Sequence, residues 1–325
     1  MTDWLSLLKA DPLPYLLAAP EPAVRWWTLR DLLDRLAGDP QTADARLAAR
    51  QSAPARTILA AQRLSGAWAT GCHLYTPKHT ATTWQLDILA DLGFTVADQP
   101  VRRACDLTFA WQLSTGAFGL YAGATSAEPC ATARTVCQLH RFGLGADPRV
   151  QAAWNWLATS QRADGGWHCR ARAMRPGTNS CFLATIKVLE ACAAVAATAT
   201  PGSFRPPDGL QQRAATLVHG CLLSPQVERF ASPTLWDRLV YPNHWYDAAS
   251  VVDALAASGY GMTDAGMPEA VALLAARQDE DGSWRQTGEL AFPGAMLYDF
   301  GHAGQASPWV TLRAARAVKQ ACGGS

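Results

Sequence analysis

The stretch WLATSQRADGGW (Trp156–Trp167) joins an apolar run, a glutamine, a polar turn and an ending of the form Gly-x-aromatic. Three further stretches follow the same order: LAAQRLSGAW (Leu59–Trp68), AWQLSTGAF (Ala110–Phe118) and LLAARQDEDGSW (Leu273–Trp284). The glycine permits a sharp turn after a helix end, where the aromatic ring can fold back and the glutamine amide can bond exposed backbone. Such recurrence predicts repeated helical units, in which the closing Trp68, Trp167 and Trp284 have structural roles.

A second set of helices lies between these turns, with starts spaced roughly 50 to 65 residues apart. They begin near Trp26, Thr82, Cys130, Ser180, Trp245 and Trp309. Apolar residues on several faces indicate that these helices are buried, whereas the single apolar stripe of Pro148–Ser160 indicates an outer helix. The chain is therefore expected to be all-α: one α6/α6 toroid of helical hairpins over residues 1–325, with Asp3–Lys9 as the sixth outer helix.

Composition limits the class of protein. Hydrophobic residues make up 49% of the chain and charged residues 17%, which suits a large buried core. A formal net charge of +1 gives no reason to expect a nucleic-acid or anionic membrane partner. Nine scattered cysteines, no signal peptide and no membrane-length apolar run favour a reduced, cytoplasmic protein. The oligomeric state stays open.

The repeat turns resemble the QW motifs of squalene–hopene cyclases and the repeats of protein prenyltransferase β subunits. YTPKHTATTWQLDILADLGF, ADGGWHC, NSCFLATIKVLEA and PWVTLRAARAVK are also similar to a group of stand-alone bacterial proteins described as prenyltransferase-like or squalene-cyclase-like. The resemblance covers essentially the whole chain and implies the toroid fold. It does not specify a reaction, because one fold hosts unrelated chemistries.

The candidate catalytic residues lie at or near inner-helix starts, which in a toroid meet at one mouth where helix dipoles favour anions. The chain lacks the DxDD motif with which class II terpene cyclases protonate their substrates, so another acid is needed. Asp247 follows Trp245 and Tyr246, and a carboxyl in an aromatic pocket has a raised pKa that suits a general acid. His244 is a neighbouring candidate. Asp87 is a further acid, although we favour its alternative role as the buried partner of a base such as Lys78 or Arg30.

Aromatic residues near the inner helices are the candidate substrate-binding residues, because aromatic faces stabilise carbocations and bind prenyl chains. They are Trp84, Phe182, Trp245, Tyr246 and Trp309. The alternative is that at least half of them only fill the axis of the toroid.

A zinc site is implied by the resemblance to prenyltransferase β subunits, which hold zinc with an Asp-x-Cys pair and a histidine one repeat later. Asn179 stands where that pattern has Asp, while Cys181 and His244 match it. Cys169 or Cys130 would complete a thiolate-rich set of the kind that zinc prefers. The alternative is that these cysteines fill space, as buried cysteines often do.

Three functions remain open from the sequence. The first is an enzyme that cyclises, isomerises or cleaves an apolar, isoprenoid-like small molecule in a pocket near Cys130, Cys181, His244 and Asp247. The second is a zinc–thiolate transferase or cyclase. The third is a non-catalytic protein that binds a hydrophobic ligand. Residues 285–306, rich in glycine and aromatics, are expected to form a loop that covers one mouth.

Overall fold

The computed structural model describes residues 3–70, 73–121, 127–168, 179–198, 204–222, 237–288 and 296–323. Throughout these residues the regular structure is helical, with only isolated antiparallel bridges such as His73 to Tyr121. The chain divides into two compact units: a terminal unit of Met1–Thr57 with Ser232–Ser325, and a central unit of Ile58–Ala231. The all-helical class is confirmed, while the closure of a single toroid domain stays a prediction.

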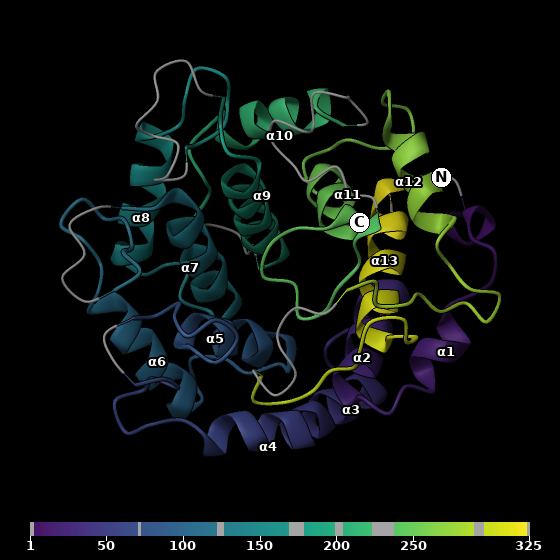
Figure 1. Cartoon of the computed structure of the whole chain (residues 1–325), viewed down its shortest axis with the longest axis horizontal. Helices are drawn as coiled ribbons and strands as arrows, with labels where there is room; N and C mark the ends of the chain where they lie inside the picture. Colours follow the sequence, from purple (N-terminus) through teal and green to yellow (C-terminus); the bar gives the residue numbers. More distant parts are fainter. Residues whose placement is uncertain are drawn as a thin grey trace. The chain divides into compact units, whose positions relative to one another are not determined.

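The central unit has two layers of helices (Figure 1). The inner helices α5, α7 and α9 are buried on nearly all faces, and α7 packs against both α5 and α9. Each carries an outer helix on its other side: α6 on α5, α8 on α7 and α10 on α9. The bounds are α5 (Thr82–Asp91), α6 (Gln99–Phe109), α7 (Pro129–Arg141), α8 (Pro148–Thr159), α9 (Phe182–Ala197) and α10 (Leu210–Gly220).

The terminal unit repeats this layering. Its inner helices are α11, α13 and α2 with its π-helical continuation η2, and α13 packs against all the others. Outer helices α12, α1 and α3 pack on them. The bounds are η1 (Trp4–Leu7), α1 (Leu13–Leu17), α2 (Pro22–Trp27), η2 (Thr28–Leu32), α3 (Pro40–Arg50), α11 (Ala248–Ala256), α12 (Met267–Ala275) and α13 (Pro308–Ala321). The chain passes from one unit to the other within α4 (Ala53–Ala60).

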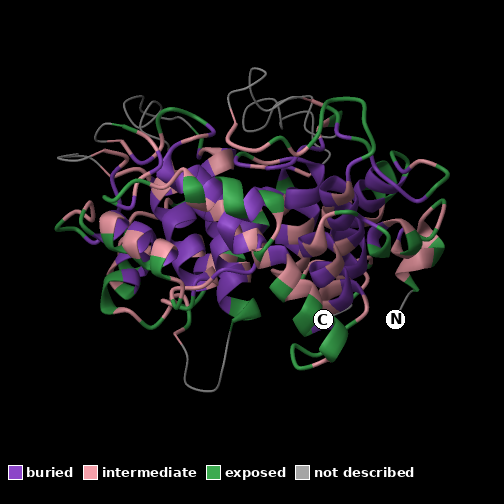
Figure 2. Cartoon of the chain, turned by 90° about the horizontal axis from the view of Figure 1, so that it is seen from below, coloured by how far each residue is buried: buried purple, intermediate pink, exposed green. Residues whose placement is uncertain are grey.

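Most predicted helix starts agree with the structure. Trp26, Thr82, Cys130 and Trp309 lie in the first turns of inner helices or close to them. Cys181 is the N-cap of α9 rather than part of it, and Trp245 precedes α11, which begins only after Asp247. The helix predicted over Asp3–Lys9 is wrong, because only one 3₁₀ turn (Trp4–Leu7) forms there. Figure 2 shows buried residues concentrated in the helices and exposed ones mainly in the loops between them.

The repeat turns fasten each outer helix to the next. Gln161 donates from Nε2 to the carbonyl of Gly165 (2.8 Å) and to that of Leu210 at the start of α10 (3.0 Å). Gly165 has a φ of +92°, and a Cβ there would lie 2.4 Å from the carbonyl oxygen of Arg213. Trp167 folds back and donates from Nε1 to the carbonyl of Leu157 (2.8 Å). The other three turns make the same two glutamine bonds, through Gln62, Gln112 and Gln278.

No described helix is long and apolar enough to cross a lipid bilayer.

Candidate functional site

Asp247 is held in a buried ion pair. It caps α11, where its side chain accepts from the backbone N–H of Ser250 (2.9 Å) in a capping box. Arg313 of α13 donates to both of its oxygens, at 2.8 and 2.9 Å. Burial alone would raise the pKa of this carboxyl, but the charge and hydrogen bonds of Arg313 and the bonds from Ser250 hold it below its usual value. The predicted raised pKa is therefore wrong, because the sequence did not reveal Arg313 as the partner.

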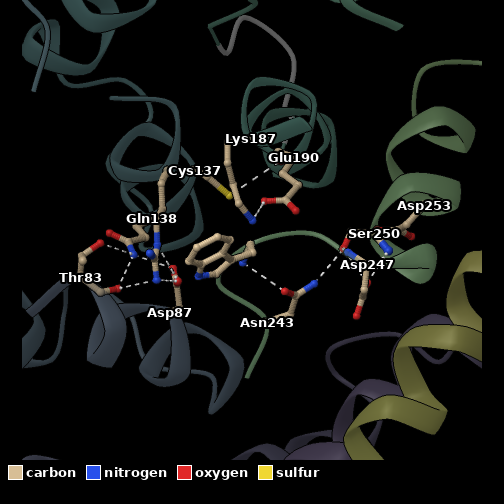
Figure 3. A network of polar contacts seen from close by, with 12 residues as sticks. Thr83, Asp87, Cys137, Gln138, Lys187, Glu190, Asn243, Asp247, Ser250 and Asp253 are labelled. Carbon is tan, nitrogen blue, oxygen red and sulfur yellow. Dashed lines mark hydrogen bonds and ion pairs between the residues drawn. The ribbon is translucent and has the colours of Figure 1, made fainter. Parts of the chain in front are cut away.

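Asp87 also forms an ion pair, as we expected, but the partner that the structure describes is Arg134 rather than Lys78 or Arg30. Arg134 of α7 donates to Oδ2 of Asp87 from both Nε (2.8 Å) and Nη2. Gln138 donates to the other oxygen, Oδ1. Figure 3 shows Asp87 of α5 meeting Gln138, which also donates to the carbonyl of Thr83. Neither Lys78 nor Arg30 is the partner described for this carboxylate; Arg30 pairs with Asp31. Asp87 thus joins the two inner helices.

The segment before α11 contains the remaining acid–base candidates of the terminal unit. Asn243 accepts from the backbone N–H of Trp245 (3.1 Å) and donates to the Ser250 hydroxyl (2.9 Å), as Figure 3 shows. His244 is buried at 5% exposure, Tyr246 is half-buried and Trp245 is 37% exposed. Trp245 is thus accessible to a ligand.

The other aromatic candidates are buried. Trp84 is 0% exposed, and Phe182 and Trp309 are each 3% exposed. In this conformation they support the surrounding wall rather than present an open ring surface.

The zinc prediction is not decided by the structure. Cys130 is in the first turn of α7 and Cys181 caps α9, both partly exposed. Cys169 lies outside the described residues, and His244 belongs to a different unit from the cysteines. Among the residues described, no group of three His, Cys, Asp or Glu side chains is placed to hold a metal ion.

The structure brings together a cluster that the sequence did not single out, at the start of α5. Tyr75 and His79, from the loop before the helix, lie against the indole of Trp84 with ring centroids 5.0 and 4.5 Å away. The guanidinium of Arg134 lies 4.9 Å from the same ring. Trp84 fixes the loop by donating from Nε1 to the carbonyl of Tyr75 (2.7 Å), and Gln85 fixes it by donating to that of His79 (2.7 Å).

His79 has a strained backbone. Its φ of +70° lies in the left-handed region, which a residue with a side chain seldom occupies. Such strain costs of order 1–3 kcal/mol and tends to persist at functional sites. The loop is held by further bonds, from the N–H of Thr83 to the carbonyl of Leu74 (3.0 Å) and from the N–H of Leu74 to the carbonyl of Leu120 (2.8 Å). The strain is thus imposed by a well-anchored loop.

The imidazole of His79 and the phenol of Tyr75 are both favoured in their neutral forms. Burial lowers the pKa of His79, and the nearby charges of Lys78 and Arg134 lower it further. Burial raises the pKa of Tyr75, with Arg134 acting in the opposite direction. The cluster therefore combines a neutral imidazole, which can accept a proton, with a neutral phenol, which can donate a hydrogen bond.

A signal for the cluster was present in the sequence. Tyr75-Thr76-Pro77-Lys78-His79 precedes α5, and Tyr241-Pro242-Asn243-His244 precedes α11. Both histidines are buried, at 8% and 5% exposure. The recurrence of tyrosine, proline and histidine before two inner helices would have identified both loops.

Comparisons with known proteins find similar structures only. No family model and no curated protein matches the chain. A protein from Actinoplanes is 18% identical, with 92% of this chain and 90% of that one covered at a TM-score of 0.49. A variant of the type II terpene cyclase MstE from Scytonema, in complex with geranylgeranyl dihydroxybenzoate, is 15% identical, with 93% and 87% covered and a TM-score of 0.49. The ent-copalyl diphosphate synthase from Streptomyces platensis is 20% identical, with 78% and 50% covered and a TM-score of 0.37. The TM-scores are below 0.5, so function is argued from the chain's own residues.

Proposed function

We propose that the chain is an enzyme that moves a proton within an apolar, isoprenoid-like substrate, as an isomerase or a lyase, at the Tyr75–His79–Trp84 cluster. The substrate class follows from the resemblance of the repeat turns to those of squalene–hopene cyclases. The observation that carries the reaction type is the neutral His79 imidazole against the Trp84 ring, 4.5 Å between centroids, on a strained backbone.

The local charge favours an anionic over a cationic intermediate. Burial lowers the pKa of His79, and Lys78 and Arg134 lower it further, so an additional positive charge beside the imidazole is disfavoured. A carbocation would be repelled there, whereas an enolate would be stabilised. Asp247 is ionised in its pair with Arg313, so the acid-initiated route loses the acid that the sequence favoured.

The step that suits these groups is proton abstraction next to a carbonyl. His79 takes the proton, and the electrons of the broken C–H bond move toward the carbonyl oxygen as a new double bond forms. Tyr75 donates a hydrogen bond to that oxygen. Return of the proton from His79 to another carbon gives an isomer, whereas departure of a leaving group gives an elimination product.

Solvent deuterium tests this proposal. The purified chain is incubated in D₂O with a panel of monoterpenoid, sesquiterpenoid and diterpenoid aldehydes and ketones, and products are analysed by mass spectrometry. We expect deuterium incorporation or a shifted double bond in at least one compound. His79→Gln should lower that rate about 10²–10⁴-fold, the usual contribution of a general base. His302→Gln, at an exposed histidine of the terminal unit, is the matched control and should leave it unchanged.

The pH profile gives a second readout. Because the pKa of His79 is lowered, activity should persist below the ordinary histidine pKa of 6.5 and be lost only as the imidazole becomes protonated. Unchanged exchange in His79→Gln would refute the assignment of the base. Tight binding of panel compounds without any exchange would instead favour the non-catalytic binding protein.

The zinc–thiolate function stays a separate proposal, with Cys181, His244 and either Cys130 or Cys169 as ligands. It is tested by elemental analysis of the purified protein: near-stoichiometric zinc that falls in Cys181→Ala would support it. Zinc-free protein with full activity would exclude it. A Cys192→Ala variant, which removes a buried cysteine outside the predicted set, is the matched control.

A further inference from the structure

Four aromatic rings gather in the terminal unit, and none of them belongs to the residues of the proposed reaction. Trp309, in the first turn of α13, stacks on Tyr241 with centroids 4.3 Å apart and an interplanar angle of 3°. Phe300 meets Tyr241 edge-on at 5.2 Å, and Tyr298 meets Phe300 at 5.0 Å. Tyr241 and Trp309 are each 3% exposed, whereas Tyr298 and Phe300 are half-buried. The rings thus run from a buried stack to a partly exposed loop.

The indole N–H of Trp309 is a buried donor that has no acceptor among the residues that the structure describes. Five other tryptophans donate from Nε1 to an acceptor: Trp68, Trp84, Trp154, Trp167 and Trp284. A buried donor left unsatisfied costs about 1–3 kcal/mol. The fold avoids this cost at those five tryptophans. At Trp309 we therefore expect a bound molecule to supply the acceptor.

The partly exposed rings lie just before a segment, residues 301–306, that is bonded to Arg285 and Gln286. Gln286 holds it by donating from Nε2 to the carbonyl of Gly301 (3.2 Å) and accepting from the N–H of Gly304 (2.7 Å). The Oε1 of the same glutamine accepts from the backbone N–H of Tyr241 (3.3 Å). Phe300 itself meets Tyr241 by a ring contact, and a ligand ring of similar size can replace that contact.

The charges nearby select a neutral ligand. Arg313, one turn after Trp309 on α13, is neutralised by its bidentate pair with Asp247 and also donates to the carbonyl of Val240 (2.8 Å). An anion would gain little from a guanidinium whose charge is already balanced. A neutral carbonyl or ether oxygen satisfies the indole N–H without adding a buried charge.

We propose that the Tyr241–Trp309 stack with Phe300 and Tyr298 is a second binding site, which takes a neutral, ring-bearing molecule through an oxygen that accepts from Trp309 Nε1. The rings supply apolar contact, and the N–H selects ligands with an acceptor. This site requires no reaction and none of the residues at the start of α5, so it stands or falls independently of the proposed isomerase or lyase.

The test compares acetophenone with α-methylstyrene, a molecule of the same shape that has a CH₂ group in place of the carbonyl oxygen. Each is titrated into protein labelled with ¹⁵N at tryptophan, and the indole N–H signals are followed by NMR. Trp309→Phe identifies the Trp309 signal. The Trp167 signal is the internal control, because its N–H is already bonded to the carbonyl of Leu157 and it belongs to neither proposed site.

Acetophenone should move the Trp309 signal downfield in a saturable way and leave that of Trp167 unchanged. α-Methylstyrene should bind about fivefold more weakly, which is the loss expected for one neutral hydrogen bond of about 1 kcal/mol. Phe300→Leu, which keeps the indole and serves if Trp309→Phe fails to fold, should weaken acetophenone binding several-fold. A Trp309 signal that neither molecule moves, or equal binding of the two, would overturn the proposal.

Discussion

Acidification should destabilise the central unit through His140, a histidine in the last turn of α7. Its ring is buried at 4% exposure, and its Nε2 accepts from the indole N–H of Trp154 on α8 (3.0 Å). Burial lowers the pKa from its ordinary 6.5 to about 4. The folded state therefore holds a neutral imidazole under conditions in which the unfolded chain has already taken up a proton.

The sign and size of the effect follow from linkage. Above pH 6.5 neither state is protonated at this site, so the full stability is present. As the pH falls from 6.5 to about 4 the unfolded state alone binds the proton, and stability is lost throughout this window. The interval between the two pKa values corresponds to about 3.4 kcal/mol at about 1.36 kcal/mol per pH unit.

The measurement is urea denaturation followed by circular dichroism, at a series of pH values between neutrality and about pH 4. His140→Gln is the matched variant, because its amide oxygen can still accept from Trp154 but does not titrate. Subtracting the two curves removes the contributions of carboxylates and other histidines. The wild type should lose about 3 kcal/mol more than the variant across the window. Parallel curves would refute the reasoning, since they would mean that His140 titrates equally in both states.

Two further predictions test the contacts that hold the helices. Gly116→Ala should destabilise the chain by about 3 kcal/mol or more, because a Cβ there would lie 2.6 Å from the carbonyl oxygen of Ala152. Gly143→Ala is the control: its φ is similar and nothing lies within 4 Å, so it should cost only about 1–2 kcal/mol for the left-handed backbone. Equal losses of stability in thermal unfolding would contradict the clash. Arg313→Met should lower the free energy of unfolding by about 3–5 kcal/mol at neutral pH, because it leaves Asp247 buried and charged. This loss of stability should shrink at acid pH, as the carboxyl takes up a proton. A loss that does not vary with pH in urea denaturation would contradict the prediction.

Local patterns in the sequence predicted what local contacts determine. The glutamine, glycine and tryptophan of each repeat turn lie within a few residues of one another, so their geometry could be inferred before the structure was known. The expected backbone bond of Gln161 is confirmed, and so is the expected folding back of Trp167, whose Nε1 meets the carbonyl of Leu157. The all-helical class followed for the same reason, because hydrophobic periodicity within each helix does not depend on the rest of the chain.

The partners of the buried carboxylates could not be predicted in this way. Asp87 and Arg134 lie on different inner helices, and so do Asp247 and Arg313, with separations of 47 and 66 residues. Which arginine faces which aspartate depends on how far each helix is shifted along its neighbour. That shift is set by packing across the whole unit, so sequence reasoning proposed aromatic surroundings for Asp247 and missed the cation that determines its pKa.

Both units place a tyrosine against a tryptophan, and the histidine contact in the central unit is the reason that we propose the reaction there. In both, a tyrosine before an inner helix contacts a buried tryptophan, at 5.0 Å for Tyr75 and Trp84 and at 4.3 Å for Tyr241 and Trp309. In the central unit the histidine of the same loop, His79, also contacts that tryptophan ring, at 4.5 Å between centroids. Burying an aspartate–arginine pair beside each stack costs desolvation energy that apolar residues would avoid. The central unit also holds the neutral imidazole of His79 near its pair, and this imidazole is the group that we propose to exchange a proton with an apolar substrate.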